Sequence, residues 1–68
     1  MTEPAEQTYF KDVARGQVNL AYEMFNQGRR ARAQYHLLEA QYYIAKIKPE
    51  FIDTELQQNL TRALRTFY

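Results

Sequence analysis

The sequence predicts an all-α fold, in which an antiparallel helical hairpin is followed by a third, C-terminal helix. Two observations carry this prediction. Apolar residues recur at spacings of three and four along most of the 68 residues, which is the period of a helix face. The strongest helix-ending signals, Gly28 and Pro49, stand between these periodic segments. The β-prone run Tyr42-Tyr43-Ile44 lies inside a long helical pattern, so no strand is predicted.

The first helix is predicted over residues 5–27, because Pro4 is tolerated only in a first turn. Gly16 lies inside it, at a cost of up to ~1 kcal/mol relative to Ala. That glycine is either a tolerated flaw or a point where another helix approaches closely. The main apolar row of this helix is Phe10, Val13, Ala14, Gln17, Leu20, Ala21 and Met24, and a shorter row is Val18, Tyr22 and Phe25.

The segment Asn26-Gln27-Gly28 ends the first helix, because Gly28 can adopt the left-handed conformation that closes a helix. The next helical pattern starts almost at once. Two helices joined by so short a turn must run antiparallel, so a helical hairpin is expected.

The second helix is predicted over residues 30–47 and ends before Pro49. It carries two apolar rows, whereas an ordinary surface helix has one. We therefore expect it to lie between neighbours. The aliphatic row suits a permanent core, and the tyrosine-containing row suits a contact that forms and dissolves. The first row is Ala33, Leu37, Ala40, Ile44 and Ile47, and the second is Ala31, Tyr35, Leu38, Tyr42 and Ala45.

The third helix is predicted over residues 50–66, with Pro49 at its first position or Asp53 as its cap. Its apolar row is Ile52, Leu56, Leu60, Ala63 and Phe67, flanked by Leu64.

Size and composition predict a single helical domain over residues 1–68 that is oligomeric or bound to a partner. A chain this short buries only about 60% of its unfolded surface. It has no Cys and one His, so disulfides, thiolate metal sites and His-rich metal sites are excluded, and no cofactor is predicted. No apolar run approaches the ~20 residues of a membrane span. The acidic N-terminus lacks signal-peptide features, so we expect a cytoplasmic protein with no membrane partner.

The hairpin resembles a single tetratricopeptide repeat over about residues 15–44. Leu20, Gly28, Ala33, Leu37 and Ala40 fall in the register of that family's pattern, and Ala21 stands where the family has a small Gly. In the resemblance, the small residues allow the helices to approach closely and the leucines fill the gaps. Three features depart from the pattern: Gln17 replaces an aromatic, Met24 replaces Tyr, and Pro49 comes four residues late. The resemblance implies binding of extended or helical peptides, in repeats that normally stack three or more deep.

Catalysis is not predicted. Gly16 and Gly28 stand alone, so no Gly-rich phosphate loop exists, and the carboxylates are dispersed. His36 precedes Glu39 by three residues, which we interpret as an exposed ion pair on one helix face rather than a base and its orienting group. No catalytic residue is assigned.

The ten aromatic residues and the basic turn predict a contact surface. Net charge is only +1, so composition does not indicate a polyanion binder. Aromatic anchors with an arginine rim are typical of binding hot spots. The predicted function is a small protein–protein interaction module that binds and regulates a larger protein, as an anti-activator, inhibitor or co-chaperone, or that forms a homodimer. The alternative is a nucleic-acid-binding regulator that uses the turn with three arginines. The candidate partner-binding residues are Tyr22, Phe25, Arg29, Arg30, Arg32, Tyr35, Leu38 and Tyr42.

Overall fold

The computed structural model describes residues 3–68, and all regular secondary structure in this part of the chain is helical, with no strand. The elements are α1 (Glu3–Asn26), α2 (Arg30–Ala45), the short 3₁₀ helix η1 (Pro49–Phe51) and α3 (Thr54–Phe67). The predicted all-α fold with a hairpin and a third helix is confirmed. Near the predicted start of the third helix the chain forms η1 instead, and α3 begins only at Thr54 with Asp53 as its cap.

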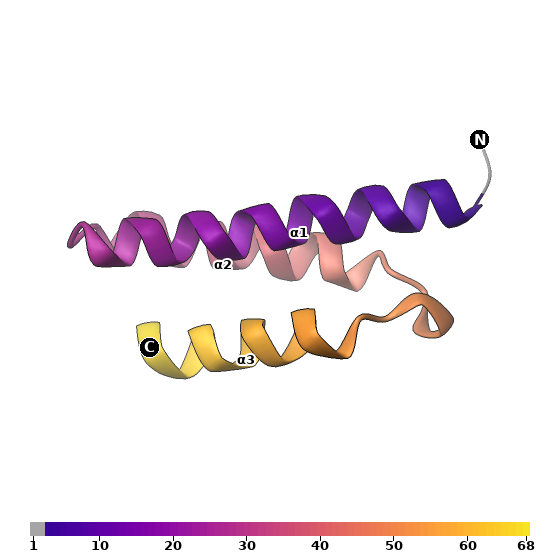
Figure 1. Ribbon diagram of the computed structural model, residues 1–68. Coiled ribbons are helices and arrows are strands. Elements are labelled where there is room, and N and C mark those ends of the chain that lie inside the picture. Colours follow the sequence, from indigo (N-terminus) through magenta and orange to yellow (C-terminus); the bar gives the residue numbers. More distant parts are fainter. Residues whose placement is uncertain (1–2) are drawn as a thin grey trace.

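The three helices lie side by side along one long axis (Figure 1). α1 and α2 are antiparallel, and α3 runs back along them, so that the C-terminus lies at the end where α1 turns into α2. The principal extents are 40 × 19 × 14 Å. A helix of 24 residues at ~1.5 Å per residue is about 36 Å long, so α1 alone accounts for most of the length.

Gly28 closes α1 in the left-handed conformation, with φ of 79°, as predicted. The N–H of Gly28 donates to the carbonyl of Phe25 at 3.0 Å, and the N–H of Arg29 donates to that of Met24 at 2.8 Å. These two bonds form a Schellman motif, which satisfies carbonyls that the end of a helix leaves without partners. The chain can therefore reverse within three residues and start α2 at Arg30.

The contact between α1 and α2 is built on small residues. Ala14, Ala21, Ala33 and Ala40 have no exposed surface, and Leu37 beside them is also fully buried. Side chains without bulk let two helix axes approach closely, and one large residue fills the remaining space. The aliphatic row of α2 is therefore its core face, as predicted.

On α1 the buried strip differs from the predicted main row. Leu20 was expected to fill the hairpin, but it is 37% exposed, whereas Val18, from the predicted minor row, is 3% exposed. The reason is the position of α3. One side of α1 faces α2 and another faces α3, so the most buried positions come from both predicted rows: Ala14 and Ala21 from the main row and Val18 from the shorter one.

α3 covers the hairpin with the row predicted for it, although Ile52 precedes the helix and is 39% exposed. The ring of Phe67 stacks on Phe25 with centroids 4.5 Å apart and meets Tyr22 edge-on at 5.1 Å. The carbonyl of Phe67 also accepts a hydrogen bond from Nε2 of Gln34, at 3.3 Å. These contacts hold the C-terminal end of α3 against both other helices. The buried residues of α3 are Leu56, Leu60, Ala63 and Phe67.

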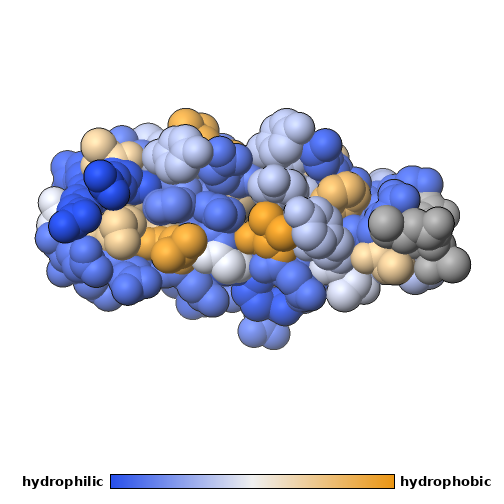
Figure 2. Space-filling view, turned by 90° about the horizontal axis from the view of Figure 1, so that it is seen from above, coloured by the Kyte–Doolittle hydropathy of each residue, from blue (hydrophilic) through white to orange (hydrophobic). Residues whose placement is uncertain are grey.

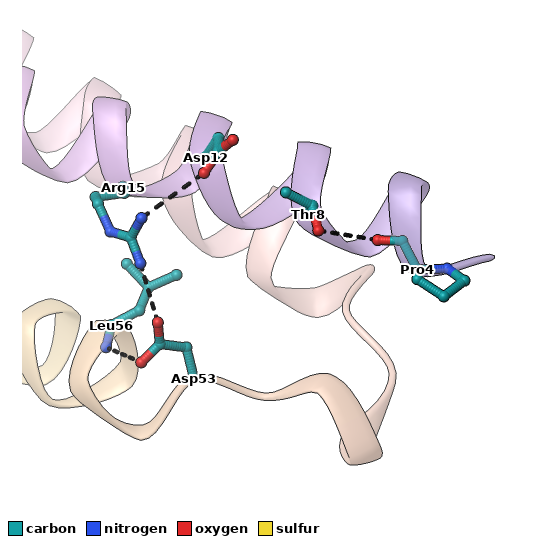
Figure 3. Close-up of polar contacts among 6 residues, drawn as sticks. All are labelled: Pro4, Thr8, Asp12, Arg15, Asp53 and Leu56. Carbon is teal, nitrogen blue, oxygen red and sulfur yellow. Dashed lines mark hydrogen bonds and ion pairs between the residues drawn. The ribbon is translucent and has the colours of Figure 1, made fainter. Parts of the chain in front are cut away.

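Two polar residues fix the opposite end of α3 and the linker before it. Asp53 accepts a hydrogen bond from the N–H of Leu56 at 3.3 Å, and its other oxygen lies 3.0 Å from Nη2 of Arg15 on α1 (Figure 3). Gln7, which is 3% exposed, accepts the backbone N–H of Lys48 at 2.8 Å. The segment between α2 and α3 is thus held to α1 at two points.

Gly16 is exposed, and a methyl group built on it would meet nothing within 4 Å. No helix of the described chain approaches it. Of the two interpretations of this glycine, the close approach of another helix is excluded within residues 3–68.

Candidate protein interface

The second apolar row of α2 lies on the side of the helix opposite its core row. We call it the outer row. Tyr35 is 57% exposed, Leu38 58% and Tyr42 56%. The helical period places Leu38 and Tyr42 about half a turn away from Ala33 and Leu37, so the same packing that buries one row must expose the other. Nothing in the described chain covers it. The outer row consists of Ala31, Tyr35, Leu38, Tyr42 and Ala45.

The exposed rings of the outer row are held by residues that are themselves fixed to α1. Tyr35 contacts the ring of His36 edge-on, and Tyr42 contacts that of Tyr43 in the same way, each with centroids 5.3 Å apart. His36 in turn donates from Nδ1 to Oε1 of Gln17 at 2.7 Å. Tyr43 packs on Phe10, with centroids 6.5 Å apart. Both tyrosines therefore have a neighbour that limits their freedom before any partner binds.

The predicted exposed ion pair between His36 and Glu39 is not formed. His36 turns toward α1 and bonds Gln17, because it lies on the flank of α2 that faces α1. Glu39 instead acts on Tyr35, whose pKa it raises above the ordinary value through a side-chain hydrogen bond and its negative charge.

The three arginines of the basic turn stand at the N-terminal end of the outer row. Arg29, Arg30 and Arg32 are exposed, and none of the three forms an ion pair with another of the described residues. α2 also starts without a side-chain cap and without an acidic residue in its first turn. Cations therefore occupy a helix end that favours anions. A shallow hollow beside them is lined by Ala31, Arg32, Tyr35 and His36.

A cation also stands at the other end of the outer row. Nζ of Lys46 lies 4.7 Å from the ring centroid of Tyr42 and 5.8 Å from that of Phe10. Lys46 was not among the residues predicted for the site from the sequence. Its spacing of four residues from Tyr42 was the signal, because residues at that distance are neighbours on a helix surface.

Two of the predicted site residues lie elsewhere. Tyr22 and Phe25 are partly buried and pack on Phe67 of α3, so their rings are part of the contact between α1 and α3. The structure brings together Tyr35, Leu38 and Tyr42 on α2, with the arginines beside them, and leaves Tyr22 and Phe25 outside this face.

Figure 2 shows the side of the molecule that faces away from α3. Apolar residues form separate patches along its length, divided by hydrophilic ones. Strongly hydrophilic residues gather at the end where α1 turns into α2. The apolar surface on this side is thus broken rather than continuous.

Other kinds of site have little support in the described residues. No group of three His, Asp or Glu side chains is placed to hold a metal ion within residues 3–68. A second hollow lies on α3 alone and is lined by polar side chains: Thr54, Gln57, Gln58, Thr61, Arg62 and Arg65. Among the described helices, none is both long enough and apolar enough to cross a membrane.

Comparison of the chain with protein-family models, with curated proteins and with solved structures finds no match. The interpretation of the outer row therefore depends on its own geometry.

Proposed function

We propose that this chain is a non-enzymatic interaction module that binds and regulates a larger protein through the outer row of α2. The observation that carries the proposal is an apolar row of two tyrosines and a leucine, each more than half exposed, on a helix whose other row is already buried. Exposed tyrosine with an arginine rim is the composition of binding hot spots. An anti-activator, an inhibitor or a co-chaperone would each act by such a contact.

The contacts behind the outer row support the same proposal. A side chain that must be ordered on binding lowers affinity, and the neighbours of Tyr35 and Tyr42 already restrict these rings. The resemblance to a tetratricopeptide repeat adds further support, since such repeats bind peptides. It concerns the hairpin only, where Ala33, Leu37 and Ala40 are fully buried and Leu20 departs from the role that the resemblance implies.

A photo-crosslinking amino acid placed on the outer row tests the proposal. Introduced at position 38 and irradiated in a lysate of the native cell, it should form a defined adduct with one protein. The same residue at position 58, which is exposed on α3, is the matched control. Equal labelling from both positions, or none from position 38, would contradict the proposal.

A double variant supplies the second half of the test. Tyr35→Ala with Tyr42→Ala should abolish the adduct at position 38 while leaving helix content by circular dichroism unchanged, because both rings are exposed. If this variant unfolds the protein, the rings belong to the core and the binding surface must be sought on α3.

A second candidate function, a nucleic-acid-binding regulator, is favoured by the three exposed arginines of the basic turn. Phosphate contacts give binding that weakens steeply with salt. A gel-shift assay with a mixed-sequence duplex and a single strand, titrated with NaCl, separates the two functions. A shift that Arg30→Glu removes and that Tyr35→Ala leaves intact would support this candidate over the first.

A further inference from the structure

The charge of the chain is concentrated in one segment. Residues 29–48 hold five of the nine basic residues and one of the eight acidic residues, a net charge of +4. The remaining residues hold four basic and seven acidic residues, a net charge of −3. The overall charge of +1 therefore conceals a cationic α2 segment on an acidic remainder.

These cations flank the outer row at both ends. Arg30 and Arg32 lie at its start and are exposed, and Lys46 lies at its end over the ring of Tyr42. The one acidic residue of the segment, Glu39, is engaged with Tyr35. A partner that covers the outer row thus meets tyrosine and leucine along its centre and positive charge at both ends.

We propose that the outer row binds an acidic amphipathic helix of a partner protein. This inference rests on the proposed function and names the chemistry of the partner. Ala31 and Ala45 are 14 residues apart, about 21 Å along the helix, so a partner helix of about 14 residues matches the length of the row. Its apolar residues would recur at spacings of three and four to meet Tyr35, Leu38 and Tyr42, with Glu or Asp at its ends.

A second copy of this chain fits the same face poorly. In an antiparallel two-fold contact centred on Leu38, Arg30 would lie opposite Lys46 of the second copy, because each is eight residues from the centre. In a parallel two-fold contact, Arg30 would face the same residue of the second copy. Either arrangement places a cation opposite a cation, whereas the carboxylates of an acidic helix would each lie opposite a cation.

A nucleic acid fits part of the surface only. Phosphates would pair with the arginines, and bases can stack on tyrosine. The aliphatic members of the row, Leu38 with Ala31 and Ala45, would gain little from a phosphate backbone. An amphipathic helix would contact these aliphatic residues as well as the tyrosines.

A library of displayed 16-residue helices provides the test. Leu or Phe is fixed at the positions of one helix face. The positions that flank this face at its two ends are randomised among Glu, Lys and Gln. We expect selection on the protein to enrich Glu over Lys several-fold at flanking positions, as the small energy of single exposed ion pairs implies. A selected peptide should lose at least about tenfold in affinity on Tyr35→Ala with Tyr42→Ala, because these are the anchors.

Two charge-reversed proteins sharpen the selection. With Arg30→Glu and Arg32→Glu, the preference should change to Lys. With Arg62→Glu and Arg65→Glu, which make the same change of charge at exposed positions of α3, the preference for Glu should remain. Circular dichroism establishes that both variants are folded before they are used.

The remaining outcomes separate this inference from the proposed function. Peptides that depend on Tyr35 and Tyr42 but show no preference for Glu would overturn the inference and leave the proposed function standing. Selected peptides that bind the double tyrosine variant equally well would overturn both. The inference also fails if a 20-residue single-stranded oligonucleotide binds more tightly than the selected peptides and Arg30→Glu removes it. A dimer in sedimentation that the tyrosine substitutions dissociate would overturn it in favour of a second copy.

Discussion

At the scale of single residues, the two glycines have opposite roles although both are exposed. Gly16 lies within α1 with open space around it, whereas Gly28 has a φ of 79°. Gly16→Ala should raise the free energy of unfolding by about 0.5–1 kcal/mol, because it removes backbone freedom from the unfolded chain only. Gly28→Ala should lower it by about 1–2 kcal/mol, because a Cβ is strained in the left-handed region. Urea unfolding followed by circular dichroism measures both, and changes of the same sign would contradict the assignment.

Asp53 serves two elements through its two oxygens, one for the N–H of Leu56 and one for Arg15. Asp53→Ala should lower the free energy of unfolding by about 1–2 kcal/mol, mostly from the lost cap. Asp53→Asn keeps a capping oxygen and removes the charge, so it should cost about 0.5 kcal/mol, since exposed ion pairs contribute little. Arg15→Ala is the control for the ion pair alone. Equal losses for Ala and Asn at position 53 would assign the stability to the pair rather than to the cap.

The sequence predicts the roles of Gly28 and Asp53 because each acts on backbone groups within a few positions of itself. Turn and capping preferences, which depend only on neighbouring residues, are enough to identify them. Gln7 with Lys48, and Gln17 with His36, are hydrogen-bonded pairs 41 and 19 residues apart. Such pairs depend on how the helices are placed, and no local preference indicates them. For this reason the predicted pairing of His36 with Glu39 was wrong.

At the scale of elements, the closeness of α1 and α2 depends on alanines. Ala40 is fully buried, so Ala40→Leu should overpack the hairpin and cost about 1–3 kcal/mol. Ala45→Leu is the matched control on the same helix, where the side chain is exposed and the cost should be within about 0.5 kcal/mol. Thermal unfolding of the two variants provides the comparison. An unchanged melting temperature for Ala40→Leu would mean that the helices are not in contact at this position.

The attachment of α3 separates the aromatic residues into two classes. Phe25 stacks on Phe67, which is 2% exposed, whereas Tyr42 lies in the outer row. Phe25→Ala should therefore destabilise the protein by about 2–4 kcal/mol. Tyr42→Ala should cost less than about 1 kcal/mol and should affect binding instead. Chemical denaturation beside peptide-binding calorimetry distinguishes them, and a larger stability loss for Tyr42→Ala would reverse the two assignments.

The helical periods predicted the elements and, on α2, which row is buried. They failed on α1, where both rows are apolar and the buried strip combines Ala14 and Ala21 of the main row with Val18 of the shorter one. When a helix contacts one neighbour, the spacing of its apolar residues identifies the face that is buried. A helix that contacts two neighbours buries a face set by the angle between them, and that angle is a property of the assembled molecule. Tyr22 and Phe25 were assigned to the binding surface for the same reason, because their contact with Phe67 requires the position of α3.

At the scale of the whole molecule, the segregation of charge predicts how self-association depends on salt. The segment of residues 29–48 has a net charge of +4, and any symmetric contact through the outer row brings two such segments together. The Debye length is about 10 Å at 0.1 M salt and about 3 Å at 1 M, so salt should weaken the repulsion and leave the apolar attraction. In sedimentation equilibrium we expect a mass near the 8.2 kDa of one chain at 0.1 M NaCl. At 1 M NaCl the mass fraction of dimer should be equal to or higher than the fraction at 0.1 M.

A single charge change separates repulsion from a general effect of salt. Arg30→Glu would place a carboxylate opposite Lys46 of a second copy in the antiparallel contact, so this variant should associate more than the parent protein at 0.1 M NaCl and less as salt is added. Arg65→Glu makes the same change at an exposed position of α3 and should leave the mass at both salt concentrations unaltered. A parent protein that is dimeric at 0.1 M and dissociates with added salt would contradict the prediction, because attraction between unlike charges would then hold the two copies together.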